Sequence, residues 1–416
     1  VLLTASTSQD VFSQAVNTNQ LEQAKSVVVH DDGTFTLGRG ADVLNTGSID
    51  VSSETNSNNS ARIVLLGENI TSNGQISADV ANGQAGEIEI HAKDKTLLTD
   101  NSITSAQAHT SGQGGFIKVL GDKVGLFDMA KVNASGANGG GEVLFGGDRQ
   151  GLNSSIRNVS YIYLGKMTTI NADALTSGDG GKIITFASDT ARIHGDMYAR
   201  GGMLSGNGGF IETSGLRGFE ITSAPDVSSV KGNGGLWLID PYNIEIVNDG
   251  VVASTNYDFA NGNPDVFTSN GESAKIEVGL IANSLLSGDV EIITGTIPVL
   301  DPPTSELGNI TFNADLTFDS NGGSPRNYEL KLIADNDITF TSSSSISRLQ
   351  TSDDSLDLVL QAGGDITLSS DTLDASAPVP LNGINLYGGK LDITSGGLVT
   401  FASGEINTGG GNITVI

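Results

Sequence analysis

The sequence of 416 residues has no cysteine, one tryptophan and only 21 basic residues. Without cysteine, disulfide scaffolds, thiolate zinc sites and cysteine nucleophiles are excluded. The 48 acidic residues give a formal net charge of −27, which opposes the phosphate contacts needed for nucleic acids and anionic membranes. No run of 18 apolar residues occurs, so we expect no transmembrane helix. Hydrophobic residues make up 37% of the chain, enough to bury a large core.

Glycine is abundant, with 55 residues, and it opens a phrase that recurs six times. The phrases are GEIEIHA from Gly86, GFIKVLG from Gly115, GEVLFGG from Gly141, GKIITFA from Gly181, GFIETSG from Gly209 and GLWLID from Gly235. Their spacings of 29, 26, 40, 28 and 26 residues are typical of solenoids and propellers. The long interval, from Gly141 to Gly181, predicts one repeat with an insertion. We expect Gly and Asn to supply the positive φ angles of the corners.

Each phrase alternates in the manner of a β-strand, whose successive side chains point to opposite faces. The second and fourth positions after the Gly are predicted to form interior columns, and the first and third to lie outside. The second position holds Ile88, Ile117, Val143, Ile183, Ile211 and Trp237, and the fourth holds Ile90, Val119, Phe145, Thr185, Thr213 and Ile239. A second set of short β-branched stretches surrounds Ile76, Ile103, Val132, Ile170 and Ile193.

At least two strands in every repeat predict an all-β fold, a parallel β-helix (β-solenoid) with loop or hairpin insertions. WD40 and kelch propellers need about 40 to 50 residues per blade and fit less well. The pattern breaks after Asp240 and resumes at Gly308, with Ile310, Ile338, Ile366 and Ile393 spaced 28, 28 and 27 residues apart. We therefore predict a β-helix over 1–247, a loop-rich insertion over 248–306, and continuing β-helix repeats over 307–416.

Four phrases occur in the order seen in large exoproteins. They are NASGANGGGEVLFGGDRQG, TINADALTSGDGGKIITFASDTARIHGDMYARGG, GNGGFIETSG and GLWLIDPYNIEI. The chain from about Asn133 to Ile246 resembles the filamentous haemagglutinin type, the passengers of two-partner secretion. The resemblance implies a right-handed β-helix with haemagglutinin-like repeats over 1–247. It also implies export through an outer-membrane transporter barrel and an extracellular place at the bacterial cell surface. Both ends of the sequence are interpreted as cuts in a longer protein.

No catalytic residue, metal site or cofactor is expected. The four histidines lack paired spacing, and neither a GxSxG elbow, a P-loop nor a calcium-binding nonapeptide occurs. Glu87, Glu89, His91 and Lys93 share one strand face, which we interpret as a solvated face. A polysaccharide lyase remains an alternative, because some β-helix proteins are lyases that use acidic clusters. The corner aspartates Asp173, Asp179, Asp189 and Asp196 are interpreted as turn residues.

Binding is expected where the regular repeats are interrupted, because loops on a rigid scaffold are the usual recognition surfaces. The candidates are Ser52 to Ser60, the long interval between Gly141 and Gly181, and Asn248 to Glu272. The second is preferred because it contains Arg149, Arg157, Tyr161 and Tyr163, residue types favoured at protein contacts. The alternative is that the two tyrosines only pack a side hairpin. Among the Asn-x-Ser/Thr triplets, Asn153 and Asn158 would be the most accessible to sugars.

We therefore expect a non-enzymatic adhesin, or the rigid stalk segment of one, that contacts a receptor on host cells or on other bacteria. A protein that captures host haem or haemopexin is one alternative. A structural filament subunit is another, since open sheet edges allow self-association.

Overall fold

The computed structural model describes residues 21–23, 27–29, 35–37, 42–54, 61–248, 250, 274–295, 307–318, 326–341, 344–348, 355–368, 383–386, 388–402 and 405–416. Strands account for 54% of it and helices for 4%. The chain divides into two compact units. Unit 1 comprises Val1–Thr213 and Pro225–Gly235, and unit 2 comprises Ser214–Ala224 and Leu236–Ile416. Within the described part, no helix has the length and apolarity that crossing a membrane requires.

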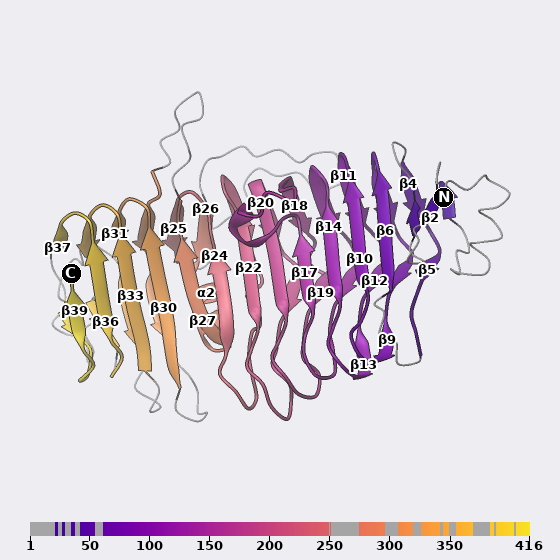
Figure 1. Cartoon of the computed structure of the whole chain (residues 1–416). Helices are drawn as coiled ribbons and strands as arrows, with labels where there is room; N and C mark the ends of the chain where they lie inside the picture. The colour runs from indigo at the N-terminus through magenta and orange to yellow at the C-terminus, as the bar shows by residue number, and fades with distance from the viewer. Residues whose placement is uncertain are drawn as a thin grey trace. The chain divides into compact units, whose positions relative to one another are not determined.

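From residue 61 on, unit 1 is built of coils whose strands stack in parallel on the equivalent strands of neighbouring coils (Figure 1), whereas residues 21–23 and 27–29 form antiparallel pairs. One coil contains β10 (Glu87–Ala92), β11 (Lys95–Leu98), β12 (Ile103–Ser105) and β13 (Ala108–Ser111). The other elements of this unit are β1 (Leu21–Gln23), β2 (Val27–Val29), β3 (Phe35–Leu37), β4 (Val43–Asn45), β5 (Ser48–Asp50), β6 (Arg62–Gly67), β7 (Ile70–Ser72), β8 (Gln75–Ser77), β9 (Val80–Asn82), β14 (Phe116–Leu120), β15 (Lys123–Leu126), β16 (Lys131–Asn133), β17 (Glu142–Phe145), η1 (Arg149–Gly151), β18 (Val159–Leu164), β19 (Thr169–Asn171), β20 (Lys182–Ile193) and β21 (Asp196–Tyr198). Strands β22 (Phe210–Gly215) and β24 (Gly235–Ile239) contain residues of both units. The predicted all-β, parallel β-solenoid fold is therefore confirmed, and the hand of its winding stays a prediction.

The predicted interior column is present. Ile63, Ile88, Ile117, Val143 and Ile183 are consecutive register partners on β6, β10, β14, β17 and β20, and each is fully buried. The fourth-position residues of the same strands are buried as well. Stacking like on like thus removes two aliphatic columns from water, which is the main favourable term in folding.

The second set of strands was predicted less accurately. Thr104, which is 1% exposed, is the partner of Ile76 and Val132 in the interior column, and Ile103 pairs with two polar residues on the other face. Ile193 belongs to a different sheet, where it is the partner of Leu164. The column of Val132 and Ile170 continues instead with Met197 of β21. Ile103 lies next to the interior position, so the β-branched pattern alone could not fix the register there.

Corner glycines such as Gly112, Gly178 and Gly206 have positive φ angles, as predicted, but no asparagine among the described residues does. The six phrase-opening glycines lack positive φ angles and have another purpose. At Gly181, an added Cβ would overlap the carbonyl oxygen of Gly141 in the preceding coil. The Gly181 N–H donates to the Ala172 carbonyl at 2.7 Å, and the next N–H donates to the Gly141 carbonyl at 2.9 Å. Glycine is needed because two backbones approach closely.

The same arrangement recurs along unit 1 and extends the column. The N–H groups of Phe116, Glu142, Lys182 and Phe210 donate to the carbonyls of Gly86, Gly115, Gly141 and Gly181 at 2.9 to 3.1 Å. Each bond places the residue after one glycine beside the glycine of the coil before. Ile211, also fully buried, follows Phe210 and continues the interior column.

Unit 2 repeats the parallel stacking (Figure 1). Its elements are β23 (Gly218–Ile221), β25 (Ile244–Val247), β26 (Ala274–Glu277), α2 (Val278–Leu285), β27 (Gly288–Ile293), β28 (Ile310–Asn313), β29 (Asp315–Phe318), β30 (Asn327–Ala334), β31 (Ile338–Phe340), β32 (Ser345–Arg348), β33 (Ser355–Ala362), β34 (Ile366–Leu368), β35 (Gly383–Asn385), β36 (Leu391–Ser395), β37 (Val399–Phe401), β38 (Glu405–Asn407) and β39 (Ile413–Val415). Ile310, Ile338 and Ile366 form one column, as predicted, and Val399 is its next member.

Two expectations for unit 2 are corrected. Ile393 does not continue the column of Ile366, because it pairs with Leu360 in another sheet. Residues 274–293, inside the range expected to be loop-rich, form β26, α2 and β27. Apolar residues of this stretch, including Ile276, Ile281 and Ile292, are fully buried. The predicted boundaries at 247/248 and 306/307 stay predictions.

Replacing Gly181 with Ala is expected to destabilise unit 1 by about 1–3 kcal/mol, because the added methyl group has to push apart two hydrogen-bonded backbones. Hydrogen exchange of peptides from β17 and β20 in urea would measure the change. Gly295→Ala is the matched control, because an added Cβ there meets nothing within 4 Å. Equal effects of the two substitutions would contradict the close-approach explanation.

Candidate functional site

The long interval between Gly141 and Gly181 contains an insertion on the outer side of unit 1, which we call the side insertion (residues 146–158). It joins β17 to β18, where the equivalent connection in the preceding coil, between β14 and β15, has two residues. Its central element is the 3-10 turn η1, which packs against β20. Phe186 of β20 points outward beneath it and is only 1% exposed. The insertion therefore buries part of the outer face of the solenoid.

This covering explains a deviation from the predicted in-and-out alternation. Leu144, Ile184 and Glu212 occupy the third position of their phrases, which was expected outside, and all three are buried. Glu87 and Lys118 lie in coils without the insertion, and they stay partly exposed on the outer face. An outer position thus becomes a core position where an insertion lies over it.

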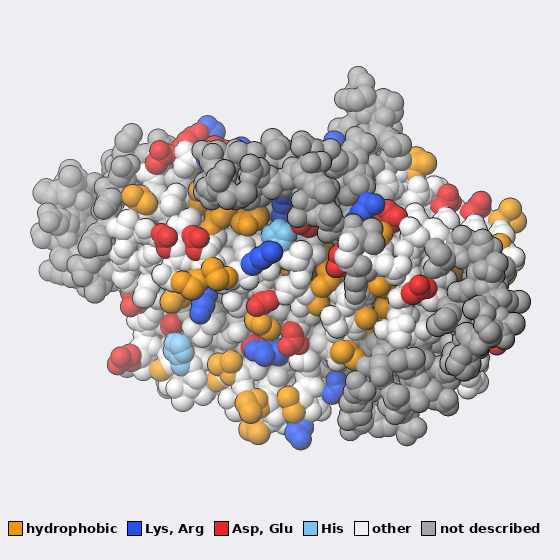
Figure 2. Space-filling model, turned by 180° about the vertical axis from the view of Figure 1, so that it is seen from behind, with side chains coloured by type: hydrophobic (Ala, Val, Ile, Leu, Met, Phe, Trp, Pro, Cys, Tyr) orange, Lys and Arg blue, Asp and Glu red, His pale blue; other side chains and the backbone are white. Residues whose placement is uncertain are grey.

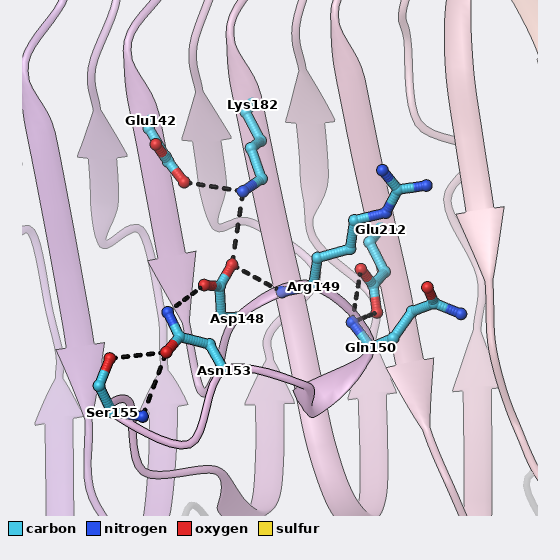
Figure 3. Close-up of polar contacts among 8 residues, drawn as sticks. All are labelled: Glu142, Asp148, Arg149, Gln150, Asn153, Ser155, Lys182 and Glu212. Atoms are coloured by element: carbon cyan, nitrogen blue, oxygen red, sulfur yellow. Dashed lines mark hydrogen bonds and ion pairs between the residues drawn. The ribbon is translucent and has the colours of Figure 1, made fainter.

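The buried carboxylate of Glu212 anchors the turn. Both of its oxygens accept the backbone N–H of Gln150, at 2.9 and 3.1 Å (Figure 3). Gln150 has a φ angle of 53°, a conformation that non-glycine residues seldom adopt. A hydrogen bond donated to a carboxylate is stronger than one donated to a neutral acceptor. We infer that Glu212 stabilises this strained turn.

Asp148 connects the turn to the strands below it (Figure 3). It accepts hydrogen bonds from the backbone N–H of Arg149 at 2.7 Å and from the side-chain amide of Asn153 at 2.8 Å. Lys182 lies 3.4 Å from Asp148 and 2.9 Å from Glu142. Burial alone would raise the pKa of Asp148, but these bonds and the Lys182 charge hold the pKa below its ordinary value. Asp148 is thus held ionised as a structural acceptor.

The two predicted arginines hold the side insertion in place. The Arg149 guanidinium lies over the Phe210 ring, 4.9 Å from its centroid, and the residue is exposed. Arg157 donates to the Lys93 carbonyl at 2.8 Å and pairs with Asp122 at 3.3 Å. Arg157 therefore ties the insertion to a strand end 64 residues earlier in the chain.

The two predicted tyrosines lie on the outer face of β18, and each is partly buried. The Tyr163 ring is 5.0 Å from that of Phe127 and 5.9 Å from that of His194. Tyr161 is the register partner of Lys123 and Thr190. The ring contacts agree with the alternative that a tyrosine packs on the solenoid. The structure therefore places Arg149 and Arg157 in the insertion and both tyrosines on the strand after it, and their role in binding stays a prediction.

Sequence reasoning missed the exposed apolar residues. Leu152, in the side insertion, is 80% exposed. A second group, the corner stripe, lies on successive turns of unit 1 and comprises Leu175, Met203, Leu204 and Val230, which are 40 to 71% exposed. The Leu204 N–H donates to the Thr176 carbonyl at 2.8 Å, which places two of these turns side by side. The side of the molecule drawn in Figure 2 shows hydrophobic side chains in small groups among charged ones. Apolar residues in Gly- and Ser-rich turns were the available signal.

The other predicted binding places lie mostly outside the described residues. Only 52–54 of the first and only 248 and 250 of the third are described. Asn153 and Asn158, the predicted accessible triplets, are both partly buried. The side-chain amide of Asn153 donates to Asp148 and that of Asn158 to the Gly151 carbonyl at 2.9 Å. Both amides thus serve the fold of the insertion.

Two clusters bear on the lyase alternative. On unit 1, Asp79 lies between Ser105, whose hydroxyl donates to it at 2.6 Å, and His109, 3.3 Å away. The serine hydroxyl donates to the carboxylate and not to the imidazole, so this trio lacks the geometry of an activated nucleophile. On the face of Glu87, Glu89 and His91, both glutamates form ion pairs with Arg62, and Glu87 also pairs with Lys118. Burial, assisted by Arg157, lowers the pKa of His91.

On unit 2, three carboxylates form a row across adjacent strands. Asp289, Glu329 and Asp357 follow one another on β27, β30 and β33. The Glu329 N–H donates to Asp289 at 3.0 Å, and Asp357 pairs with Lys390 at 3.3 Å. Burial, followed by the neighbouring carboxylates, raises the pKa values of Asp289 and Glu329. Among the described residues, no group of three or more His, Cys, Asp or Glu side chains is arranged to hold a metal ion.

No known protein family matches the sequence, and no curated protein matches it significantly.

Replacing Glu212 with Ala is expected to destabilise unit 1 by about 1–3 kcal/mol, because the Gln150 N–H loses its buried acceptor. Hydrogen exchange should increase throughout the side insertion, and Glu212→Gln, which keeps one oxygen, should retain most of the protection. The control is Glu142→Ala, which removes a partly exposed ion pair worth at most about 1 kcal/mol. Unchanged exchange of the insertion in Glu212→Ala would contradict its anchoring role.

The carboxylate row predicts a pH dependence for unit 2. Because the folded state holds protons at Asp289 and Glu329 to higher pH than the unfolded chain, their contribution to stability is present at low pH. It is lost as the pH rises through their raised pKa values. Glu329→Gln should therefore increase stability at neutral pH and flatten this dependence. Urea unfolding between about pH 5 and pH 8, followed by fluorescence of the single tryptophan Trp237, would measure it. A parallel shift at every pH would contradict the prediction.

Proposed function

We propose that this chain is a rigid, non-enzymatic segment of a secreted bacterial surface protein that acts as an adhesin or as its stalk. The observation that carries the proposal is the parallel β-solenoid itself. Its strands pair with the equivalent strands of adjacent coils, and such arrays present long surfaces on a stiff scaffold. The resemblance of residues 133–246 to haemagglutinin-type exoproteins supplies the surface location and the export through an outer-membrane transporter.

The charge distribution supports a protein partner. The net charge of −27 opposes nucleic acid and anionic lipid. Many outer-face charges are already paired between coils, as in Lys182 with Glu142 and Arg157 with Asp122. Several apolar residues of unit 1 are exposed, among them Leu152 and the corner stripe. Burying exposed apolar side chains contributes most to protein recognition.

We therefore assign partner contact to Leu152, flanked by the exposed Arg149, with the corner stripe as a second surface. This assignment refines the predicted set of Arg149, Arg157, Tyr161 and Tyr163. Arg157 and Tyr163 mainly stabilise the solenoid. The Arg157 side chain contacts Lys93 and Asp122, and the Tyr163 ring contacts Phe127 and His194.

Beads coated with the chain are expected to bind host cells or other bacteria. Leu152→Ser should reduce binding at least about tenfold, because an exposed contact worth at least about 1.4 kcal/mol is lost. Met129→Ser is the matched control, because Met129 is 47% exposed on another turn of unit 1. Circular dichroism should be unchanged in both variants. Absence of binding to every cell type would reject the adhesin role and leave the stalk.

The same material separates the alternatives. Retention of a haem-carrying serum protein would favour the capture function, and regular filaments in electron micrographs would favour the structural subunit. Turnover of uronate polymers, followed by absorbance, would favour the lyase.

A further inference from the structure

One sheet of unit 2 departs from the order of the chain. In its regular part, β28, β31, β34 and β37 are neighbours in the order in which they occur in the sequence. At its beginning, β25 lies between β26 and β28, with Ile246 as the register partner of both Ile276 and Phe312. β26, which comes later in the chain than β25, thus precedes β25 in the spatial order of the sheet.

The opposite side of β26 identifies its place more fully. β26 also contacts β23, so the spatial order is β23, β26, β25, β28, as the labels of Figure 1 allow the reader to follow for β25 and β26. β26 therefore lies on the N-terminal side of β25, although it follows β25 in the sequence. β26 thus pairs with the strand that precedes it in the sequence, but on the side opposite to the one on which β28, β31, β34 and β37 are added.

The elements that follow β26 complete the same block. Helix α2 buries Val278, Ile281 and Leu285 and packs against β27 and β29. β29 is the first strand of the sheet that continues with β32, β35 and β38, and β27 pairs with β30. The segment from β26 to β27 thus contributes to all three faces on which the later coils are built.

A polar contact joins the three strands at the crossover. One oxygen of Glu245 on β25 lies 2.7 Å from the Lys275 ammonium on β26, and the other accepts a hydrogen bond from Asn313 on β28 at 3.1 Å. The bond from Lys275 is the largest of the effects that hold the pKa of Glu245 below its ordinary value. The Glu245 side chain of β25 therefore binds to both neighbouring strands, β26 and β28.

We infer that β25, β26, α2 and β27 fold in one concerted step, which interrupts the otherwise sequential addition of coils. A parallel strand needs a neighbour to supply its hydrogen-bond partners. The native neighbour of β25 on its N-terminal side is β26, so it exists only after β26 has been placed. Coils C-terminal to this block then have to wait for it. The inference stands independently of the proposed surface role, because it rests only on the strand order within unit 2.

Refolding of the full chain with pulsed hydrogen exchange and mass spectrometry tests this step. Peptides containing Ile244–Val247 and Ala274–Glu277 are expected to become protected in the same kinetic phase. Peptides from β31, β34 and β37 should follow or accompany them. Protection of β25 in a phase that clearly precedes β26 would overturn the inference.

A pair of matched variants gives an equilibrium test. Ile276 on β26 and Ile338 on β31 are both fully buried. Ile276→Asn disrupts β26, the neighbour of β25 on its N-terminal side. Protection in β25, which precedes β26 in the sequence, should therefore fall by at least about tenfold. Ile338→Asn disrupts β31, the neighbour of β28 on its C-terminal side. β28, which precedes β31 in the sequence, should therefore keep its protection. Peptides around Ile88 and Ile117 report whether unit 1 remains folded in each variant. Equal loss in β25 and β28 would overturn the inference.

Discussion

The structure depends on the close approach of neighbouring backbones in the stacked coils. Parallel strands lie about 4.8 Å apart, and in unit 1 this spacing is maintained by a column of glycines whose carbonyls accept an N–H from the next coil. A side chain at Gly141 or Gly181 would overlap the backbone. The columns of Ile88, Ile117 and Val143 can be continuous only because this spacing is the same at every coil. The abundance of glycine is thus a packing requirement as well as a consequence of sharp corners.

The side insertion shows what happens when a regular coil acquires extra residues. It adds a second, small core on the outer face, where Phe186 and Ile184 are buried beneath η1. The polar groups that the turn brings with it find partners already present on the strands, such as Glu212 and Lys182. An insertion can therefore be stable on a solenoid when the strands below it supply both an apolar floor and buried acceptors.

The sequence was sufficient for the fold because the solenoid is determined by local periodicity. The spacing of the glycine phrases and the alternation at Ile88 and Ile90 predicted the parallel stacking and the interior columns. The sequence could not place Thr104 inside and Ile103 outside, because both side chains are compatible with either face and only the neighbouring coils decide. It also could not predict the order of β25 and β26, which depends on contacts between distant segments.

The candidate site was predicted in position and only partly in composition. The long interval between Gly141 and Gly181 indicated an insertion, and Arg149 and Arg157 lie in it. That Arg157 would reach Lys93, or that a glutamate 62 residues away would hold Gln150, follows from which coils become neighbours in three dimensions. The exposure of Leu152 was not predicted: its place in a polar turn was a signal, but a single leucine does not show by itself whether its side chain is buried.

On the outer face of unit 1, several charged side chains lie beside partners of opposite sign on another coil. Glu87 lies between Arg62 and Lys118, and Glu142 is followed by Lys182. Each such pair, partly exposed to water, adds little to the free energy of folding. Its effect is on the choice of neighbour: a coil that slipped past its proper partner, or met the same coil of another molecule, would bring like charges together. These pairs therefore favour the native pairing of coils over alternative pairings within a repetitive chain.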